Sequence, residues 1–376
     1  MTETVFEARE LTLITAALNQ LGSPARAHRL GGKAGALIAR LGPPGGDTRP
    51  VRRFQRAELK LMRLAIFDGK GVASETRHLT DKLTRIVLAK QLEGLPENQV
   101  RWGSAMPYFA FNLAAVVGVF VFRPRWQDLA LCLGLYFVRM FAVGGGLHRY
   151  FSHKSYSTSR AFQGVLAVLA STCGQQGPIW WAAAHRHHHR FSDLPEDFHS
   201  PSQRGFWWAH QLWAFTDRGQ RTDLSTVKDL TRFPELRWLN DYWLVPHLVL
   251  VLILLVAGGL RAVEWGFFVS TVLLWQVSFT VNSLSHLVGS RRFETSDTSR
   301  NNWVLALLTL GDGWHNNHHY YPGSMRAGFY WWEIDVTSYI IRALSWGGLV
   351  WNIRTPPRHV LELGRLKRQP STAALD

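Results

Sequence analysis

The residues of this chain that could do chemistry are, above all, its histidines, which are grouped rather than scattered. The chain has 376 residues and 16 histidines. Nine of the 16 fall into four short groups at the ends of apolar stretches. In two groups the spacing is i, i+3 and i+4, which places three imidazole rings on one face of a helix. The nine are His148, His153, His185, His188, His189, His286, His315, His318 and His319.

Taken together, these groups predict a metal centre. A single histidine beside a membrane-type apolar stretch is more often a surface or hydrogen-bonded residue than a ligand. Nine neutral nitrogen donors, however, exceed what one four-coordinate zinc or one six-coordinate metal can use. We therefore predict a dinuclear centre. Imidazole binds zinc, copper, iron and nickel alike, so the ligand type does not name the metal.

The other two groups have different spacings. His148 and His153 are five residues apart, and a regular α-helix would not align both rings. The glycine run at 144–146 would let the backbone bend or pack closely there. Asn282 precedes His286 at i, i+4, so these two side chains are predicted to share a helical face.

Apolar stretches of membrane-spanning length must position these groups. One pair covers about 106–122 and 128–147, and a second covers 242–260 and 263–285. Each stretch is near the ~20 residues that a helix needs to cross a bilayer. We predict an all-α integral membrane protein with four transmembrane helices. The apolar run 161–184 is broken by CGQQGP and is expected to form packed or interfacial helices, not a fifth span.

The charge distribution predicts an orientation. The formal net charge is +15, and the basic residues gather before residue 102, in 290–300 and in 353–368. Because Lys and Arg flank the cytoplasmic ends of spans, we place both termini and the active site in the cytoplasm. A cytoplasmic helical cap would complete the metal site. Membrane orientation explains the basic residues without a nucleic-acid partner.

The chain is predicted to have three parts. Residues 1–101 form a basic extension of unknown role, 102–355 form the membrane domain, and 356–376 form a basic tail. The first residues contain early acidic side chains and no apolar core, so no cleavable signal peptide is expected. Cys132 and Cys173 lie in apolar stretches and support neither a disulfide framework nor a cysteine zinc site.

The motif set HRYFSH, HRHHH, NSLSH and GDGWHNNHH resembles that of the membrane fatty acyl desaturases, of the stearoyl-CoA or delta-9 type and especially their stand-alone bacterial members. The resemblance covers about residues 102–355. It implies that the nine histidines bind two ferrous ions (Fe2+) and that Asn282 holds a metal through water. It also implies an enzyme that uses O2 and two electrons to place a cis double bond in a saturated acyl chain.

Further residues take roles only through this resemblance. Trp181 stands where the family has a tryptophan near the bent acyl chain, although an interfacial aromatic anchor is the alternative. Asp312 replaces the glutamate that the family commonly carries before GWHNNHH. Its shorter side chain changes how far the carboxylate reaches toward the ligand rings. Acidic and histidine side chains near the motifs are expected to orient the ligand rings. These residues are Asp193, Asp197, His199, Asp312, Glu333 and Asp335.

The partners follow from this reaction. The acyl chain would arrive as a coenzyme A thioester or a lipid ester, beside membrane lipids, and the sequence does not separate the two carriers. The segment after Trp351 has no haem or cluster ligands, so a separate electron donor is expected, of the ferredoxin and flavin reductase type or the cytochrome b5 type. Chain length, double-bond position and oligomeric state also stay open.

Two alternatives remain. A related di-iron membrane hydroxylase of a lipid or an alkane would begin with the same removal of hydrogen. A membrane metal transporter would need ligands at mid-membrane along a pore, whereas the histidine groups lie at the ends of the apolar stretches.

Overall fold

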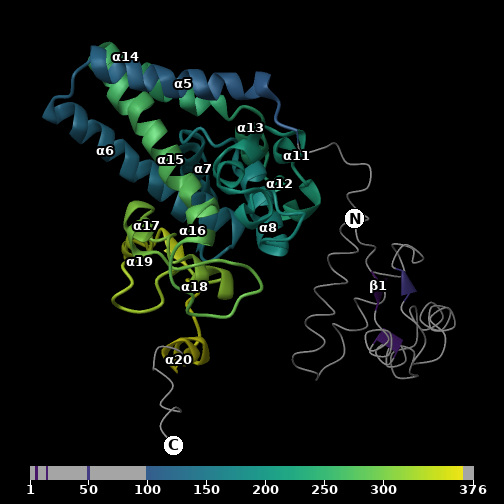
Figure 1. Cartoon of the computed structure of the whole chain (residues 1–376). Helices are drawn as coiled ribbons and strands as arrows, with labels where there is room; N and C mark the ends of the chain where they lie inside the picture. Colours follow the sequence, from purple (N-terminus) through teal and green to yellow (C-terminus); the bar gives the residue numbers. More distant parts are fainter. Residues whose placement is uncertain (1–4, 7–13, 16–48, 51–98, 367–376) are drawn as a thin grey trace, which may run out of the picture. The chain divides into compact units, whose positions relative to one another are not determined.

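The computed structural model describes residues 5–6, 14–15, 49–50 and 99–366 (Figure 1). The chain divides into two units, Met1–Leu95 and Pro96–Asp376. In the first unit β1 (Val5–Phe6) pairs antiparallel with β2 (Arg49–Pro50). Apart from these strands and residues 14–15, the predicted extension up to residue 98 lies outside the described residues, as do residues 367–376 of the predicted tail. The helices, the core and the candidate site described below all belong to the second unit.

Among the described residues, three helices are long and apolar enough to cross a membrane. The first is α5 (Trp102–Val121). The second is α6 (Trp126–Phe141), which continues into the π-helix η3 (Ala142–Ser152) to give 27 helical residues. The third covers the 44 residues Leu244–Leu287. The expectation of a helical protein with membrane-spanning helices is confirmed at this level.

The third of these helices reverses direction at a glycine. Gly259 has φ 65° and ψ −162°, a backbone conformation that glycine adopts without steric cost. The chain then folds back on itself. His247 precedes Gly259 in the sequence and Phe267 follows it, yet their ring centroids lie only 4.5 Å apart. Four elements make up this stretch: α14 (Leu244–Val263), η6 (Glu264–Val269), α15 (Ser270–Asn282) and α16 (Leu284–Leu287).

A buried arginine connects these long helices. The guanidinium of Arg139, on α6, donates hydrogen bonds to the hydroxyls of Thr271, at 2.7 Å, and of Ser270. It also reaches the carbonyl of Thr172, at 3.3 Å, in the loop that follows α7. A buried charge is costly unless it is hydrogen-bonded. Arg139 therefore joins α6, α15 and this loop through polar contacts inside an apolar region.

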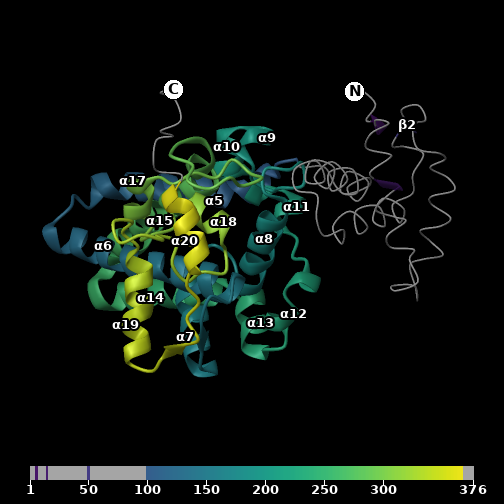
Figure 2. The ribbon, with the colours of Figure 1, turned by 90° about the horizontal axis from the view of Figure 1, so that it is seen from below.

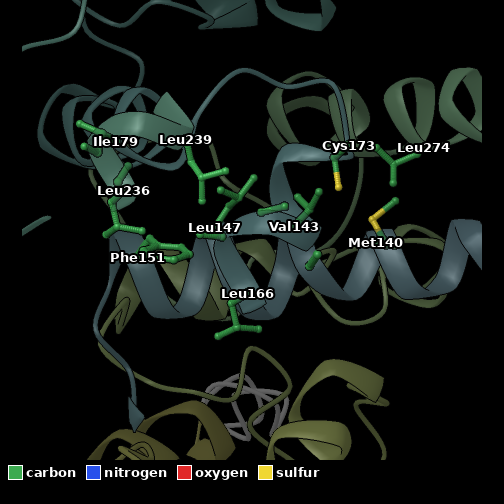
Figure 3. Close-up of a cluster of buried hydrophobic side chains, with 14 of the residues drawn as sticks. Met140, Val143, Leu147, Phe151, Leu166, Cys173, Ile179, Leu236, Leu239 and Leu274 are labelled. Atoms are coloured by element: carbon green, nitrogen blue, oxygen red, sulfur yellow. The ribbon is translucent and has the colours of Figure 1, made fainter. Parts of the chain in front are cut away.

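The apolar run 161–184 forms two packed helices, α7 (Arg160–Ser171) and α8 (Pro178–Phe191). Ser159 caps α7 by accepting a hydrogen bond from the Phe162 amide, and Pro178 occupies the first turn of α8. Figure 3 shows the core that holds them against η3 and α13 (Pro234–Asp241). It contains Leu147, Phe151, Leu166, Ile179, Leu236 and Leu239.

Short elements complete the unit around the long helices. α17 (Trp303–Leu308) lies beside α15 in both views (Figure 1 and Figure 2), and α19 (Val336–Trp346) packs against η3. The remaining elements are β3 (Ser157–Thr158), α9 (Pro201–Arg204), α10 (Phe206–His210), η4 (Leu212–Phe215), α11 (Asp217–Gln220), η5 (Leu224–Thr226), α12 (Lys228–Thr231), α13 (Pro234–Asp241), α17 (Trp303–Leu308), α18 (His315–Tyr320), α19 (Val336–Trp346), β4 (Val350–Trp351) and α20 (Arg358–Leu366). β3 and β4 pair antiparallel.

Candidate metal centre

The π-helix η3 brings the first histidine pair together. In a π-helix the backbone hydrogen bonds join residues five apart, and the His153 amide donates to the His148 carbonyl at 3.2 Å. The two rings consequently lie 5.0 Å apart, centroid to centroid. A regular α-helix would have separated them. The wider turn explains how a spacing of five serves one site.

The other histidines lie on three separate helices. α8 carries His185, His188 and His189, and α18 carries His315, His318 and His319, both with the expected i, i+3, i+4 spacing. His286 lies on α16, after a break at Ser283 with φ −109° and ψ −73°. The single helical face expected for Asn282 and His286 is therefore divided between α15 and α16.

All nine predicted histidines gather in two groups, and within each group the candidate ligand atoms lie within 4.8 Å of one another. The tripods do not stay intact, since His188 separates from the other two histidines of α8. His318 likewise separates from its neighbours on α18. The first group is His148, His153, His185, His189 and His318, and the second is His188, His286, His315 and His319.

Within each group the Nε2 atoms point at one another. The Nε2-to-Nε2 distances are 2.9 Å for His148 and His318, 2.8 Å for His153 and His185, 2.9 Å for His189 and His318, 3.1 Å for His286 and His315, and 3.4 Å for His188 and His319. An imidazole whose Nδ1 carries the proton has a lone pair at Nε2. Converging lone pairs repel unless a cation lies between them. The donor set therefore fits two metal ions.

Four carboxylates determine which nitrogen carries the proton. Each lies within hydrogen-bonding or ion-pairing distance of a histidine Nδ1, which leaves Nε2 free to face a metal and fixes the ring. The pairs are His148 with Asp312 at 3.2 Å, His188 with Asp197 at 3.0 Å, His286 with Asp193 at 3.1 Å, and His319 with Asp297 at 2.7 Å. Sequence reasoning missed Asp297, because no regular spacing connects it to a histidine motif.

The remaining residues expected to orient the rings lie further away. His199 has its ring 4.3 Å from that of His188, and its buried Nδ1 lies 3.9 Å from Asp197, with no hydrogen-bond partner among the described residues. Asp335 binds Arg149 at 2.9 Å, and Arg149 in turn binds Asp312. Glu333 forms no hydrogen bond or ion pair with any histidine that the structure describes.

Glu333 instead supports the helix that carries the fourth motif. It accepts a hydrogen bond from Asn317 of α18 at 2.8 Å and forms an ion pair with Arg292 at 2.7 Å. It therefore holds α18 against the loop that follows α16. Its effect on the histidines runs through the backbone of that helix.

Burial determines the charge state of the rings. It lowers the pKa of five histidines well below the usual value, and the neighbouring rings add to the effect. These histidines are neutral near pH 7, the form that binds metals. They are His153, His185, His189, His315 and His318.

His188 and His319 differ because a carboxylate faces each of them. For His188, burial opposes the charged ring, but Asp197 outweighs burial and raises the pKa. For His319, burial prevails over Asp297, and the pKa falls to about 4. The histidines in turn lower the pKa of both carboxyl groups, against the effect of burial. Both carboxylates are therefore ionised and accept from Nδ1.

A cavity of about 990 Å³ reaches the histidines. His148, His185, His188, His315 and Asn282 line its inner end. Most of its remaining wall is aromatic or aliphatic, with side chains such as Tyr108, Phe111, Trp181, Phe268 and Trp275. Its size and lining suit a long apolar ligand.

Trp181 lies on this wall next to the histidines. Its ring stacks on His185 with centroids 4.9 Å apart. Its Nε1 donates to Gln175 at 3.2 Å, and the Gln175 amide donates to the Ser278 hydroxyl at 2.7 Å. These bonds fix the indole against the cavity, although no spacing in the sequence singled out Gln175 or Ser278.

Known proteins match this chain over the same region. The family model for fatty acid desaturase matches residues 124–352. The sn-2 palmitoyl-lipid 9-desaturase of Nostoc sp. is 38% identical over 265 residues, 69% of this chain and 92% of the relative. The sn-1 stearoyl-lipid 9-desaturase of Anabaena variabilis is 32% identical over 262 residues, 68% and 94% of the two chains. The Acyl-CoA C20 Delta5-desaturase of Anemone leveillei is 32% identical over 263 residues, 68% and 84%.

The matched region contains all four histidine motifs and both groups of converging nitrogens. The resemblance noted in the sequence is thus confirmed, and so is the expected oxidoreductase activity on fatty acyl chains. This chain belongs to the fatty acid desaturase family.

Proposed function

We propose that this desaturase uses O2 to introduce a cis double bond at the delta-9 position of a saturated acyl chain, with two ferrous ions held by the nine histidines. One observation carries the proposal: an apolar cavity ends at two groups of histidine nitrogens that converge on common points. Iron with O2 supplies an oxidant able to take hydrogen from an unactivated methylene, which no side chain provides.

The protein's own residues would hold the metals and the chain. Asp193, Asp197, Asp297 and Asp312 keep the Nδ1 protons in place, so that each ring presents its Nε2 lone pair. Asn282 lines the cavity together with His315, and we assign it a metal contact through water.

Trp181 would position the acyl chain. Its indole is held by Gln175 and stacked on His185, so it presents a rigid apolar face next to the reacting carbons. The aromatic lining excludes water from the methylenes being oxidised. We propose that this aromatic wall determines where the acyl chain bends.

The membrane arrangement has four spans. Gly259 divides the 44-residue helical stretch into two antiparallel arms. These two arms, α5, and α6 together with η3 are the four spans. An even number of spans places both termini on one side, and the basic flanks make that side cytoplasmic. The extension 1–101, the tail 356–376, the helical cap and the metal centre then face the cytoplasm. There a separate donor of the ferredoxin and flavin reductase type or the cytochrome b5 type supplies electrons.

Product analysis tests the proposal. The chain is produced in a host lacking desaturation, and the fatty acids are analysed by mass spectrometry after derivatisation of double bonds. His188→Ala removes a metal ligand, and His359→Ala serves as the control because His359 is exposed on α20. We expect a delta-9 monoene in cells with the unmodified protein and the control, and none with His188→Ala. Hydroxylated products would instead identify the hydroxylase alternative.

A further inference from the structure

The cavity that reaches the histidines also opens on the outer surface of the long helices. Leu248 of α14 lines the cavity and is 62% exposed. Leu244 on the same helix and Pro107 on α5 also line it and are exposed. A side chain that faces both the cavity and the exterior stands at a rim. The cavity therefore has a mouth between α5 and α14.

The two sides of the mouth are matched. Ser104, Pro107 and Phe111 lie on one face of α5, and Leu244, Leu248 and Val251 lie on one face of α14. Each set spans eight residues, a rise of about 10 Å. Both stripes begin near the first turn of their helix, so the mouth extends from the helix ends into the apolar region.

η6 forms the floor between the two helices. The Phe111 and Phe268 rings lie 4.7 Å apart, which joins α5 to η6. The His247 and Phe267 rings lie 4.5 Å apart, which joins α14 to η6. Phe267, Phe268 and Trp275 continue the lining inward. A chain entering between α5 and α14 would run over these aromatic rings toward Trp181.

The surface around the mouth is apolar. Beyond the rim, α5 exposes residues such as Leu113 and Phe120, and α14 exposes Leu252 and Val256. These helices are two of those long and apolar enough to cross a membrane. The mouth thus opens where acyl chains of the bilayer would surround the protein.

From these features we infer that an acyl chain enters sideways from the bilayer, still esterified to a membrane glycerolipid. This inference rests on the proposed desaturase function and selects the lipid ester over the coenzyme A thioester.

The charge of the cavity supports the same carrier. Coenzyme A carries several phosphate charges, which proteins bind with Arg and Lys. Among the described residues that line the cavity, Arg101 is the one Arg or Lys, and Asp217 pairs with it at 2.7 Å. Ser104, Gln176 and Gln220 supply neutral polar groups near it. Such a rim suits the ester groups and the single headgroup phosphate of a glycerolipid better than the several phosphates of coenzyme A.

A matched pair of variants tests the route. Leu248→Trp fills the mouth, whereas Leu252→Trp adds the same bulk to α14 at a position that is 59% exposed and does not line the cavity. Membranes from a host that forms the monoene are washed free of coenzyme A and ATP, so that acyl chains released from lipid cannot be converted to the thioester. NADPH and dialysed host extract supply electrons. The membrane phospholipids carry 13C-labelled stearoyl chains, and deuterated stearoyl-CoA is added.

The isotope found in the monoene shows whether the desaturated chain came from phospholipid or from stearoyl-CoA. The unmodified protein and Leu252→Trp should form 13C-labelled monoene on phospholipid, and Leu248→Trp should form at least tenfold less at equal iron content. Equal rates for the two variants, or monoene that carries only deuterium, would overturn the lateral route. If the proposed desaturase function is wrong, the producing cells contain no new monoene, and this result is seen before the labelling experiment begins.

Discussion

At the scale of single residues, the carboxylates behind the rings are as informative as the histidines. Each of the four ionised aspartates holds an Nδ1 proton, so the ring is oriented before any metal binds. Asp297 makes the shortest of these contacts, 2.7 Å to His319. It belongs to the loop between the third and fourth histidine motifs, a segment for which the sequence predicted a basic flank of the membrane but no part in the metal site.

Asp297→Asn should weaken metal binding at the second histidine group, which contains His319. The amide keeps the shape but removes the charge that opposes burial of His319, and such outer partners typically affect metal affinity by about 10–100-fold. We expect iron to fall from two per chain toward one after dialysis against a chelator, measured by elemental analysis. Asp241→Asn, at an exposed position at the end of α13, should keep both ions. Unchanged iron in Asp297→Asn would contradict this role.

Trp181→Phe separates a positioning role from an anchoring role. Phenylalanine keeps an aromatic ring beside His185 but loses the hydrogen bond to Gln175. We expect an unchanged iron content, about tenfold less monoene and a broader distribution of double-bond positions by mass spectrometry. Trp207→Phe, at an exposed position on α10, should change neither quantity. A product profile identical to that of the control would leave Trp181 as an interfacial anchor only.

At the scale of elements, local helix geometry decides which histidines meet. η3 is a π-helix, and only its wider turn brings His148 and His153 together. α18 depends on close packing as well, because it begins two residues after Gly313, which lies against the backbone of α17. A change of backbone spacing at either place would move several of the converging histidines at once.

Gly313→Ala should therefore lower stability and metal content together. The added Cβ would overlap the backbone of Ala306 and Leu305, which cannot yield as a flexible side chain would. We expect a loss of about 1–3 kcal/mol, typical of overpacking, seen as a lower Tm in detergent, with less iron per chain. Gly323→Ala is the control, since a Cβ there meets nothing within 4 Å. Equal Tm values for the two variants would show that α17 moves aside freely.

At the scale of the whole molecule, the candidate metal centre and the cavity lie within one of two units. The family match begins at residue 124, and the described site residues all belong to the unit Pro96–Asp376. No group in Met1–Leu95 was assigned chemistry. The two units are therefore expected to be separable in function.

Removal of residues 1–95 should preserve the reaction. We expect two irons per chain and an unchanged monoene in the producing cells, because every proposed ligand and the whole α5–α14 mouth remain. Removal of 1–111 should abolish both, since it deletes the α5 side of the mouth and Phe111, which packs on η6. Loss of iron in the shorter deletion would show that the extension supports the fold.

The sequence by itself determined the kinds of residue and the elements that carry them. The nine histidines, the apolar helices and the break in 161–184 were all readable, because hydropathy and helical spacing are properties of neighbouring residues. The identity of the metal and the reaction came from resemblance, since imidazole alone does not distinguish iron from other metals.

Only the tertiary structure decided how these parts combine. His188 leaves its own tripod to join His286, and His148 meets His318 across 170 residues of chain. Asp297 reaches His319 through a loop, and the mouth between α5 and α14 depends on η6 packing against both. Such contacts join segments whose approach depends on the packing of the whole core, and no local pattern of residues specifies that packing.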